Sequence, residues 1–123
     1  MPLNTYLVED NPVIRANLTE TLQELAGVKV VGHAEEALDA SRWLLDHPHG
    51  WELAIVDLFL RTGSGIAVLG ALRQRRAAQR VIVVSNYATP EMRTRCLAAG
   101  ADQVFDKSTE VEALVHYCLS LGM

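Results

Sequence analysis

The chain has 123 residues, of which 50% are hydrophobic and 21% are charged, and its net charge is -4 at pH 7. These values are typical of one globular domain, and they exclude a disordered segment and a strongly basic nucleic-acid-binding protein. No apolar run approaches the roughly 18 residues of a membrane-spanning helix, and the first residues lack the features of a signal peptide, so we expect a cytoplasmic protein.

Short apolar runs alternate along the chain with longer segments in which apolar residues recur every three or four positions. The short runs are the predicted strands, at residues 6–8, 28–31, 53–56, 81–84 and 104–105. Most are continuously apolar, as is typical of parallel strands covered by helices on both faces. The intervening and following segments are predicted to be helices, with the repeating positions Ile14, Leu18, Leu22 and Leu25; Ala37, Ser41, Leu44 and Leu45; Ile66, Leu69 and Leu72; Met92, Cys96 and Ala99; and Val111, Leu114, Val115 and Cys118.

Capping residues mark the ends of several predicted helices. Asn11 and Thr89 each precede a proline, which suits the first helical position, and Thr109 with Glu112 has the spacing of a capping box. Gly27 follows the first helix, where a left-handed residue often closes the last turn. Five strand-then-helix units with short connections predict an open, doubly wound α/β sheet.

Polar residues follow four of the five predicted strands. Glu9 and Asp10 follow the first strand, Asp57 the third, Ser85 the fourth and Lys107 the fifth. Ligands of such sheets bind outside the carboxyl ends of the strands, so these side chains should meet at one edge. Each residue alone is better explained as a helix entry, a turn former or a surface charge. Together they supply the groups that one phosphoryl-transfer site requires.

The three acids imply a cation and a phosphoryl acceptor. Carboxylates held within a few ångströms repel one another, so without compensation one would be protonated or the loops would splay. Mg²⁺ prefers oxygen ligands and keeps several waters, and its charge with that of Lys107 cancels the three negative charges. Asp57 is the candidate acceptor because it ends the central strand and a carboxylate can form an acyl phosphate. Ser85 and Lys107 could each contact a phosphoryl oxygen.

These residues resemble the landmarks of the response-regulator receiver family. The similar segments are Val8-Glu9-Asp10-Asn11, Ile55-Val56-Asp57-Leu58, Gly63-Ser64-Gly65, Val83-Val84-Ser85 and Ala99-Gly100-Ala101-Asp102 followed by Lys107. The resemblance covers the whole chain. It implies one receiver domain over residues 1–123, with no output domain in this chain, and a flavodoxin-like parallel sheet with strand order 2-1-3-4-5 and five helices.

The resemblance also implies a phosphorylation-dependent switch of a two-component system rather than a turnover enzyme. A sensor histidine kinase or a phosphotransfer protein would phosphorylate Asp57. Mg²⁺ would be bound by Asp10, Asp57 and the backbone carbonyl of Phe59, and Glu9 would assist, often through water.

The family's switching movement implies a partner surface as well. Ser85 and Lys107 would move toward the phosphoryl group and shift the face formed by helix four, strand five and helix five, where a downstream effector would bind. We expect no direct binding to nucleic acid or membrane by this domain, and a homodimer stays open.

Three departures bear on how far the family's mechanism carries over. Ser108 follows Lys107 where the family usually has proline, so the cis peptide common in the family is not expected here. Arg61 stands where the family usually has proline, which loosens that loop and adds a cation near the site. Val104 stands at the position of the switch aromatic, and the adjacent Phe105 should point to the opposite face of the sheet. We therefore expect coupling to run through the loop that carries Tyr87 or to be weak. Phe59 and Tyr87 also flank the expected path of attacking water, where they either slow acyl-phosphate hydrolysis or simply pack the loops.

Other arginines have a simpler interpretation. Arg73, Arg75, Arg76 and Arg80 surround the end of the third predicted helix, which favours a solvated helix end over a nucleic-acid site. Arg93 on the fourth predicted helix is expected to be an exposed charge.

Alternative functions stay open at this point. A receiver-like interaction module that works without phosphorylation is one, because Val104 replaces the switch aromatic. A phosphatase of the haloacid dehalogenase type is another, although such enzymes typically need an acid two residues after the acceptor, where this chain has Phe59. Nucleotide-binding α/β domains fit less well, since no glycine-rich loop follows the first strand. The segment Val30-Val31-Gly32-His33-Ala34 resembles receivers attached to helix-turn-helix outputs, so a stand-alone regulator and an excised domain both remain open.

Overall fold

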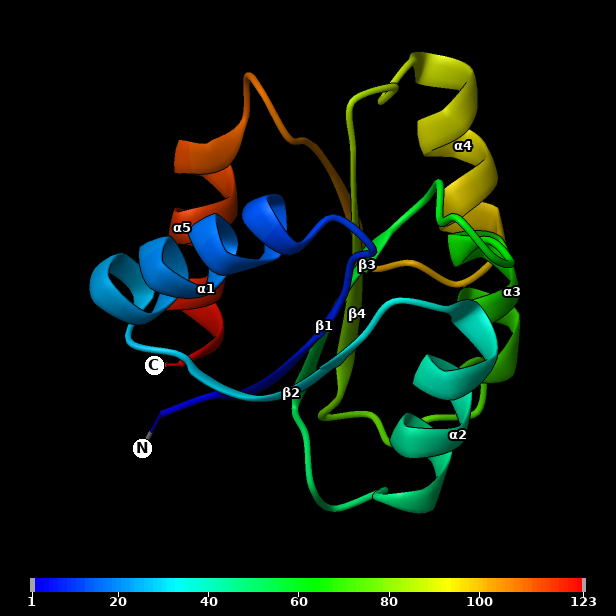
Figure 1. Ribbon diagram of the computed structural model, residues 1–123, viewed down its shortest axis with the longest axis horizontal. Helices are drawn as coiled ribbons and strands as arrows, with labels where there is room; N and C mark the ends of the chain where they lie inside the picture. Colours follow the sequence, from blue (N-terminus) through cyan, green and yellow to red (C-terminus); the bar gives the residue numbers. More distant parts are fainter. Residues whose placement is uncertain (1, 123) are drawn as a thin grey trace.

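The fold is an α/β sandwich of five strands and five helices. It is seen in a computed structural model that describes residues 2–122. The elements are β1 Asn4–Val8, α1 Pro12–Ala26, β2 Lys29–Ala34, α2 Ala37–Asp46, β3 Leu53–Asp57, α3 Gly65–Ala71, β4 Arg80–Ser85, α4 Pro90–Ala98, β5 Gln103–Asp106 and α5 Val111–Leu121. The strands form one parallel sheet in the order β2-β1-β3-β4-β5, which confirms the predicted topology. Helices α1 and α5 cover one face, and α2, α3 and α4 cover the other (Figure 1).

Three strands extend past the apolar runs at the edge where polar residues were predicted to gather. β3 includes Asp57 and β4 includes Ser85, because their backbones still pair with Val84 and Asp106 of the neighbouring strands. β5 likewise continues through Asp106. Asp57 and Ser85 are therefore held by the regular sheet, whereas Glu9, Asp10 and Lys107 lie in the loops that directly follow β1 and β5.

Alternate residues of the strands supply two separate cores. Val104 packs with the α2–α4 layer, whereas Phe105 packs with the α1–α5 layer, which confirms that the two point to opposite faces. Leu22 of α1 is fully buried, but Leu25 and Leu45 are exposed, contrary to the predicted apolar faces. Both lie in the last turns of their helices, where periodicity alone does not say how far the sheet extends.

Most of the predicted caps are present. The side chain of Asn11 accepts hydrogen bonds from the amides of Val13 and Ile14, and that of Thr89 accepts one from Met92. Gly27 has a φ of 66°, in the left-handed region. Within residues 2–122, no helix is long and apolar enough to cross a membrane.

The capping box predicted for α5 is wrong. Glu110, not Thr109, is the N-cap residue of this helix, and its side chain makes no capping hydrogen bond. The amide of Thr109 instead donates to the carboxylate of Asp106, as does that of Ser108. A local turn around Asp106 therefore displaces the start of the helix, because short acidic side chains compete well for nearby amides.

Helix α3 begins at Gly65, where its backbone packs closely against the end of β3. A Cβ at Gly65 would lie 2.5 Å from the carbonyl oxygen of Asp57, whereas a Cβ at Gly70 in the same helix would meet nothing within 4 Å. We expect Gly65→Ala to lower the free energy of unfolding by about 1–3 kcal/mol through overpacking. Gly70→Ala, the matched control, should be neutral or should stabilise by up to about 1 kcal/mol. Urea unfolding of the two variants checks this, and equal stabilities would contradict it.

Candidate functional site

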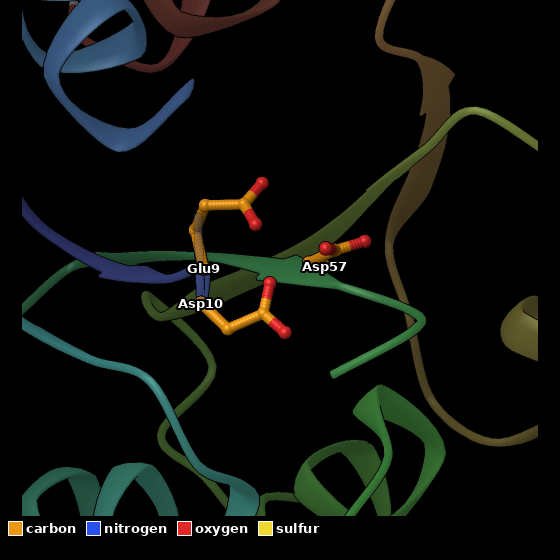
Figure 2. Close-up of side chains that lie close together, drawn as sticks. All are labelled: Glu9, Asp10 and Asp57. Carbon is orange, nitrogen blue, oxygen red and sulfur yellow. The ribbon is translucent and has the colours of Figure 1, made fainter. Parts of the chain in front are cut away.

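Three carboxylates meet at the carboxyl edge of the sheet. Glu9 and Asp10 directly follow β1 and Asp57 ends β3, and one oxygen of each lies within 4.8 Å of the others (Figure 2). The pairing of β1 with β3, which sets Val8 beside Val56, brings them together. Glu9 and Asp57 are buried, whereas Asp10 is partly exposed.

Lys107 is the positive charge of the cluster. It follows β5, and its amide donates to the carbonyl of Ser85 at 3.0 Å, which fixes the end of β5 against β4. Its Nζ lies 2.5 Å from Oε1 of Glu9 and 3.0 Å from Oδ2 of Asp57. Burial lowers the pKa of Lys107, but the contacts with Glu9 and Asp57 outweigh it and the pKa is raised from its ordinary value. Lys107 is therefore a cation that bridges two of the three acids.

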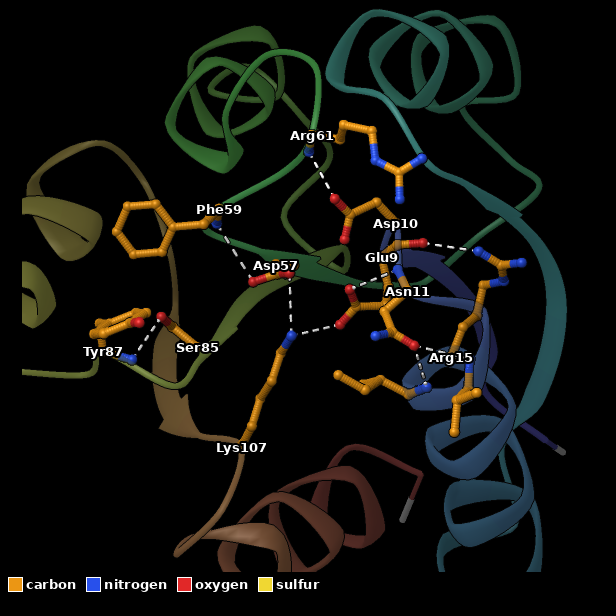
Figure 3. Close-up of polar contacts among 12 residues, drawn as sticks. Glu9, Asp10, Asn11, Arg15, Asp57, Phe59, Arg61, Ser85, Tyr87 and Lys107 are labelled. Atoms are coloured by element: carbon orange, nitrogen blue, oxygen red, sulfur yellow. Dashed lines mark hydrogen bonds and ion pairs between the residues drawn. The ribbon is translucent and has the colours of Figure 1, made fainter.

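Main-chain amides supply further compensation to each acid. Asn11 donates to Oε2 of Glu9 at 3.2 Å, Arg61 donates to Oδ2 of Asp10 at 2.6 Å, and Phe59 donates to Oδ1 of Asp57 at 3.4 Å (Figure 3). Two of these amides belong to the β3–α3 loop, residues 58–64. Hydrogen bonds to the ionised form favour it, so this loop helps to keep negative charge at the site.

Asp57 nevertheless does not ionise as easily as an ordinary aspartate. Burial, opposed by the charge of Lys107 and reinforced by the charge of Glu9, raises the pKa of Asp57 to about 6. The negative charges of the cluster are thus only partly balanced by Lys107. A divalent cation would complete the balance, and the donor set fits one, because the available ligands are carboxylate oxygens, which hard cations such as Mg²⁺ prefer. The acidic triad can hold a metal ion.

Ser85 and the two aromatic residues border the same edge. Ser85 is buried, and its Oγ accepts a hydrogen bond from the amide of Tyr87 at 3.0 Å. Tyr87 belongs to the β4–α4 loop, residues 86–89, and its ring meets that of Phe59 edge to face, with centroids 5.4 Å apart. The side chains of both are more than half exposed, at 65% and 53%. They form an aromatic rim beside Asp57, as Figure 3 shows.

The structure brings together the charged side chains that the sequence predicted to meet, but the prediction missed some of their supports. Glu9, Asp10, Asp57 and Lys107 gather as predicted, whereas the metal-binding role of the Phe59 carbonyl stays a prediction. Arg15 was missed: its guanidinium donates to the main-chain carbonyl of Glu9 at 2.9 Å and lies 3.4 Å from Glu35. Its place one turn after the Asn11 cap could have suggested contact with the strand end. The amides of Asn11 and Arg61 carried no signal, since nearly every residue has one.

The arginines around the end of α3 are partly solvated, as predicted, because Arg73 and Arg76 are exposed and Arg75 and Arg80 are half-buried, but they also make structural contacts. Each of the four around the end of α3 donates to at least one main-chain carbonyl; they are Arg73, Arg75, Arg76 and Arg80. Arg75 also pairs with Asp102 at 2.8 Å, and Asp102 accepts from the amide of Val81. These arginines tie the loops at the opposite edge of the sheet to one another.

Arg93 on α4 was expected to be an exposed charge, but it is half-buried. Its guanidinium donates to the carbonyls of Ala88 and Val104 at 2.9 and 3.0 Å, and it pairs with Glu110 at 2.5 Å. The hydrogen bond from Arg93 lowers the pKa of Glu110. Arg93 therefore joins the β4–α4 loop, β5 and the residue before α5.

Comparison with known sequences identifies close similarity to one family. The sequence profile of the response regulator receiver domain matches residues 5–118. Protein-glutamate methylesterase/protein-glutamine glutaminase 5 of Myxococcus xanthus is 32% identical over 109 residues, which are 88% of this chain and 31% of that protein. This chain spans between 29% and 51% of the length of the curated relatives that it matches.

Solved structures share the fold. A CheX-CheY-BeF₃-Mg²⁺ complex from Borrelia burgdorferi contains a chain that matches with a TM-score of 0.85 at 19% identity, over 100% of this chain and 91% of that one. A response regulator from Burkholderia pseudomallei, solved with a phosphorylated aspartic acid, calcium and citrate, matches with a TM-score of 0.77 at 26% identity, over 92% and 64%. These likenesses agree with the sheet order and helix layers described above.

The raised pKa of Asp57 predicts that its ionised form destabilises the metal-free fold. Because a pKa of about 6 in the folded chain exceeds the ordinary value of 3.8, stability should fall as pH rises through this interval. Asp57→Asn removes the carboxyl group that causes this loss of stability. At pH 7.5, with a chelator present, the free energy of unfolding of the variant should exceed that of the natural chain by roughly 1–3 kcal/mol. The difference in stability between the two should shrink toward pH 4. Urea unfolding across this pH range checks it. Asp46→Asn, at an exposed position, is the matched control, and a less stable Asp57→Asn at pH 7.5 would contradict the expectation.

Proposed function

This chain belongs to the response regulator receiver domain family, and from that membership we propose that it is a phosphorylation-dependent switch of a two-component system. Asp57 accepts the phosphoryl group. The observation that carries the proposal is the cluster at the sheet edge, in which Glu9 and Asp10 lie beside Asp57 and Lys107 bridges Glu9 and Asp57. Receiver domains are typically signalling modules without turnover, and this chain acts in that way.

The phosphoryl step uses groups already in place. An oxygen of Asp57 attacks the phosphorus of the donor, a bond to that oxygen forms as the bond to the leaving group breaks, and the leaving group takes the electron pair. Lys107 pairs with a phosphoryl oxygen, and Ser85 donates its hydroxyl hydrogen to another, because a hydroxyl oxygen that accepts from the Tyr87 amide can still donate its own hydrogen. The donor is a sensor histidine kinase or a phosphotransfer protein.

Mg²⁺ is the proposed cofactor, since the receiver family uses it and the oxygen donors fit it. Asp10, Asp57 and the main-chain carbonyl of Phe59 would hold it, with Glu9 assisting. When bound, it supplies positive charge that offsets the negative charge of the transferring group. The bound Mg²⁺ of the Borrelia burgdorferi complex and the phosphorylated aspartic acid of the Burkholderia pseudomallei regulator support this assignment.

The wider parts of the proposal follow from this chemistry. Residues 1–123 act as one receiver domain in the cytoplasm, as is typical of receiver domains. A downstream protein effector binds the face formed by α4, β5 and α5. The CheX-CheY complex among the similar structures supports binding to a protein partner.

One observation favours a second candidate, a receiver-like module that works without phosphorylation. Val104 is 6% exposed and packed in the α2–α4 core, and Phe105 faces the other core, so β5 offers no aromatic side chain that could rotate at this face. Coupling through the loop that carries Tyr87 answers this objection, because the Tyr87 amide already contacts Ser85. Equal binding of an effector by the natural chain and Tyr87→Ala would count against that route.

Labelling with a small-molecule donor tests the proposal directly. Acetyl phosphate with Mg²⁺ should add the mass of one phosphoryl group to the natural chain and to Asp46→Asn, but not to Asp57→Asn, as measured by intact-protein mass spectrometry. A chelator should prevent the addition. Absence of labelling on the natural chain would favour the phosphorylation-independent module, and turnover of a phosphate ester would favour a phosphatase.

The aromatic rim predicts a slow loss of the phosphoryl group. Phe59 and Tyr87 crowd the approach to Asp57, so removing either ring should let water reach the acyl phosphate more easily. We expect Phe59→Ala and Tyr87→Ala to dephosphorylate faster than the natural chain, because excluding water from a site protects a reactive intermediate from hydrolysis. Leu119→Ala, at an exposed position on α5, is the control. Unchanged rates would mean that the rings only pack the loops.

A further inference from the structure

The carboxylate of Asp10 is held by a single main-chain group. The amide of Arg61 donates to its Oδ2 at 2.6 Å, and no other hydrogen bond reaches this side chain within residues 2–122. Glu9 and Asp57 are both buried and both pair with Lys107, whereas Asp10 is partly exposed. Asp10 is therefore the least restrained acid of the triad.

The β3–α3 loop that supplies this amide is fixed at both ends. The amide of Ala37, the first residue of α2, donates to the carbonyl of Thr62 at 3.3 Å, and the amide of Gly65 donates to the carbonyl of Leu58 at 2.9 Å. The Arg61 amide is thus presented by a loop whose position is set by two neighbouring elements. It is a preorganised donor rather than a group that must be ordered when a ligand arrives.

We propose that the main-chain amide of Arg61, and not its guanidinium, is a positioning group that holds Asp10 ready for a divalent cation. The inference rests on the proposed function, in which Mg²⁺ binds the triad. A carboxylate can accept an amide on one oxygen and a metal on the other, since each oxygen has two lone pairs. Figure 3 shows the amide meeting one oxygen of Asp10 while the other oxygen points toward Asp57.

Without this donor, electrostatic repulsion would work against metal binding. Asp10 has two negative neighbours within the triad and a free path to solvent, so its side chain would rotate away from Glu9 and Asp57. The cation would then have to draw it back. Removing a hydrogen-bond partner of a metal ligand typically weakens metal binding about 10–100-fold. For Asp10, which is partly exposed and has one such partner, the loss of affinity should lie near the lower value.

The guanidinium of Arg61 does not hold the carboxylate of Asp10. It is exposed, and no ion pair joins its guanidinium to an acid among the described residues. Its charge could change the affinity for Mg²⁺ only through long-range repulsion, which salt screens. Two variants separate the amide from the charge: Arg61→Ala removes the guanidinium and keeps the N–H, whereas Arg61→Pro removes both.

The experiment compares Mg²⁺ binding by these two variants and the natural chain, using calorimetry and amide chemical shifts. Because Arg61→Ala and Arg61→Pro carry the same charge, their difference excludes the guanidinium and reports loss of the N–H together with the backbone restriction of proline, which the second measurement below avoids. We expect Arg61→Pro to bind Mg²⁺ about ten-fold more weakly than Arg61→Ala. Equal affinities would overturn the inference, and so would tighter binding by Arg61→Pro. Failure of the natural chain to bind Mg²⁺ would instead overturn the proposed function, and this inference with it.

A second measurement needs no variant and decides the matter if Arg61→Pro does not fold. The scalar coupling across the hydrogen bond, between the Arg61 amide nitrogen and the Asp10 carboxyl carbon, is measured with and without Mg²⁺. The coupling should be present in both states. Its loss on addition of Mg²⁺ would show that the amide competes with the metal, and it would overturn the positioning role.

Discussion

The constraint on which this structure depends is the repulsion among Glu9, Asp10 and Asp57, held with oxygens within 4.8 Å at one edge of the sheet. Lys107 and three main-chain amides offset part of it. The offset is incomplete, because the net effect of burial and charge still raises the pKa of Asp57 to about 6. The site is thus built to be completed by positive charge, and a bound cation would stabilise the fold as well as the chemistry.

The surrounding architecture holds that cluster in place. Parallel pairing of β1 with β3, and of β4 with β5, brings the strand ends to one edge, and the amide of Lys107 on the carbonyl of Ser85 ties the last strand to it. The close approach of Gly65 to the carbonyl of Asp57 lets α3 press against the end of β3. The three acids repel one another, but they are attached to strands and loops whose hydrogen bonds and packing hold them close together. The rest of the fold therefore maintains an unfavourable arrangement of charge at this edge.

The sequence allowed the fold and the acidic cluster to be predicted because both depend on patterns of side chains. Continuous apolar runs marked the buried strands, and polar residues immediately after them marked the edge. The supports of the site depend on the backbone, and the amide of Arg61 has no counterpart in the pattern of side chains. The predicted start of α5 was wrong for a related reason. Thr109 and Glu112 have the spacing of a capping box, but the amides of Ser108 and Thr109 donate to the carboxylate of Asp106 instead. Local hydrogen-bond competition of this kind is decided by geometry that the sequence alone does not contain.

The face formed by α4, β5 and α5, which we propose as the effector site, is held by polar contacts rather than by an aromatic ring. Arg93 donates to the carbonyl of Ala88 in the β4–α4 loop and to that of Val104 in β5, and it pairs with Glu110 at the start of α5. Since the same loop carries Tyr87, whose amide contacts Ser85, a displacement of this loop must break or re-form contacts of Arg93. The side chains of Arg93 and Glu110 are about one third exposed, so solvent lowers the stabilisation from their pairing below the roughly 1.5–3 kcal/mol of a buried charged hydrogen bond. The contacts of Arg93 must nevertheless rearrange together when the loop moves. Arg93 thereby connects the loop that borders Asp57 to the proposed effector face, even though Val104 cannot rotate as an aromatic side chain would.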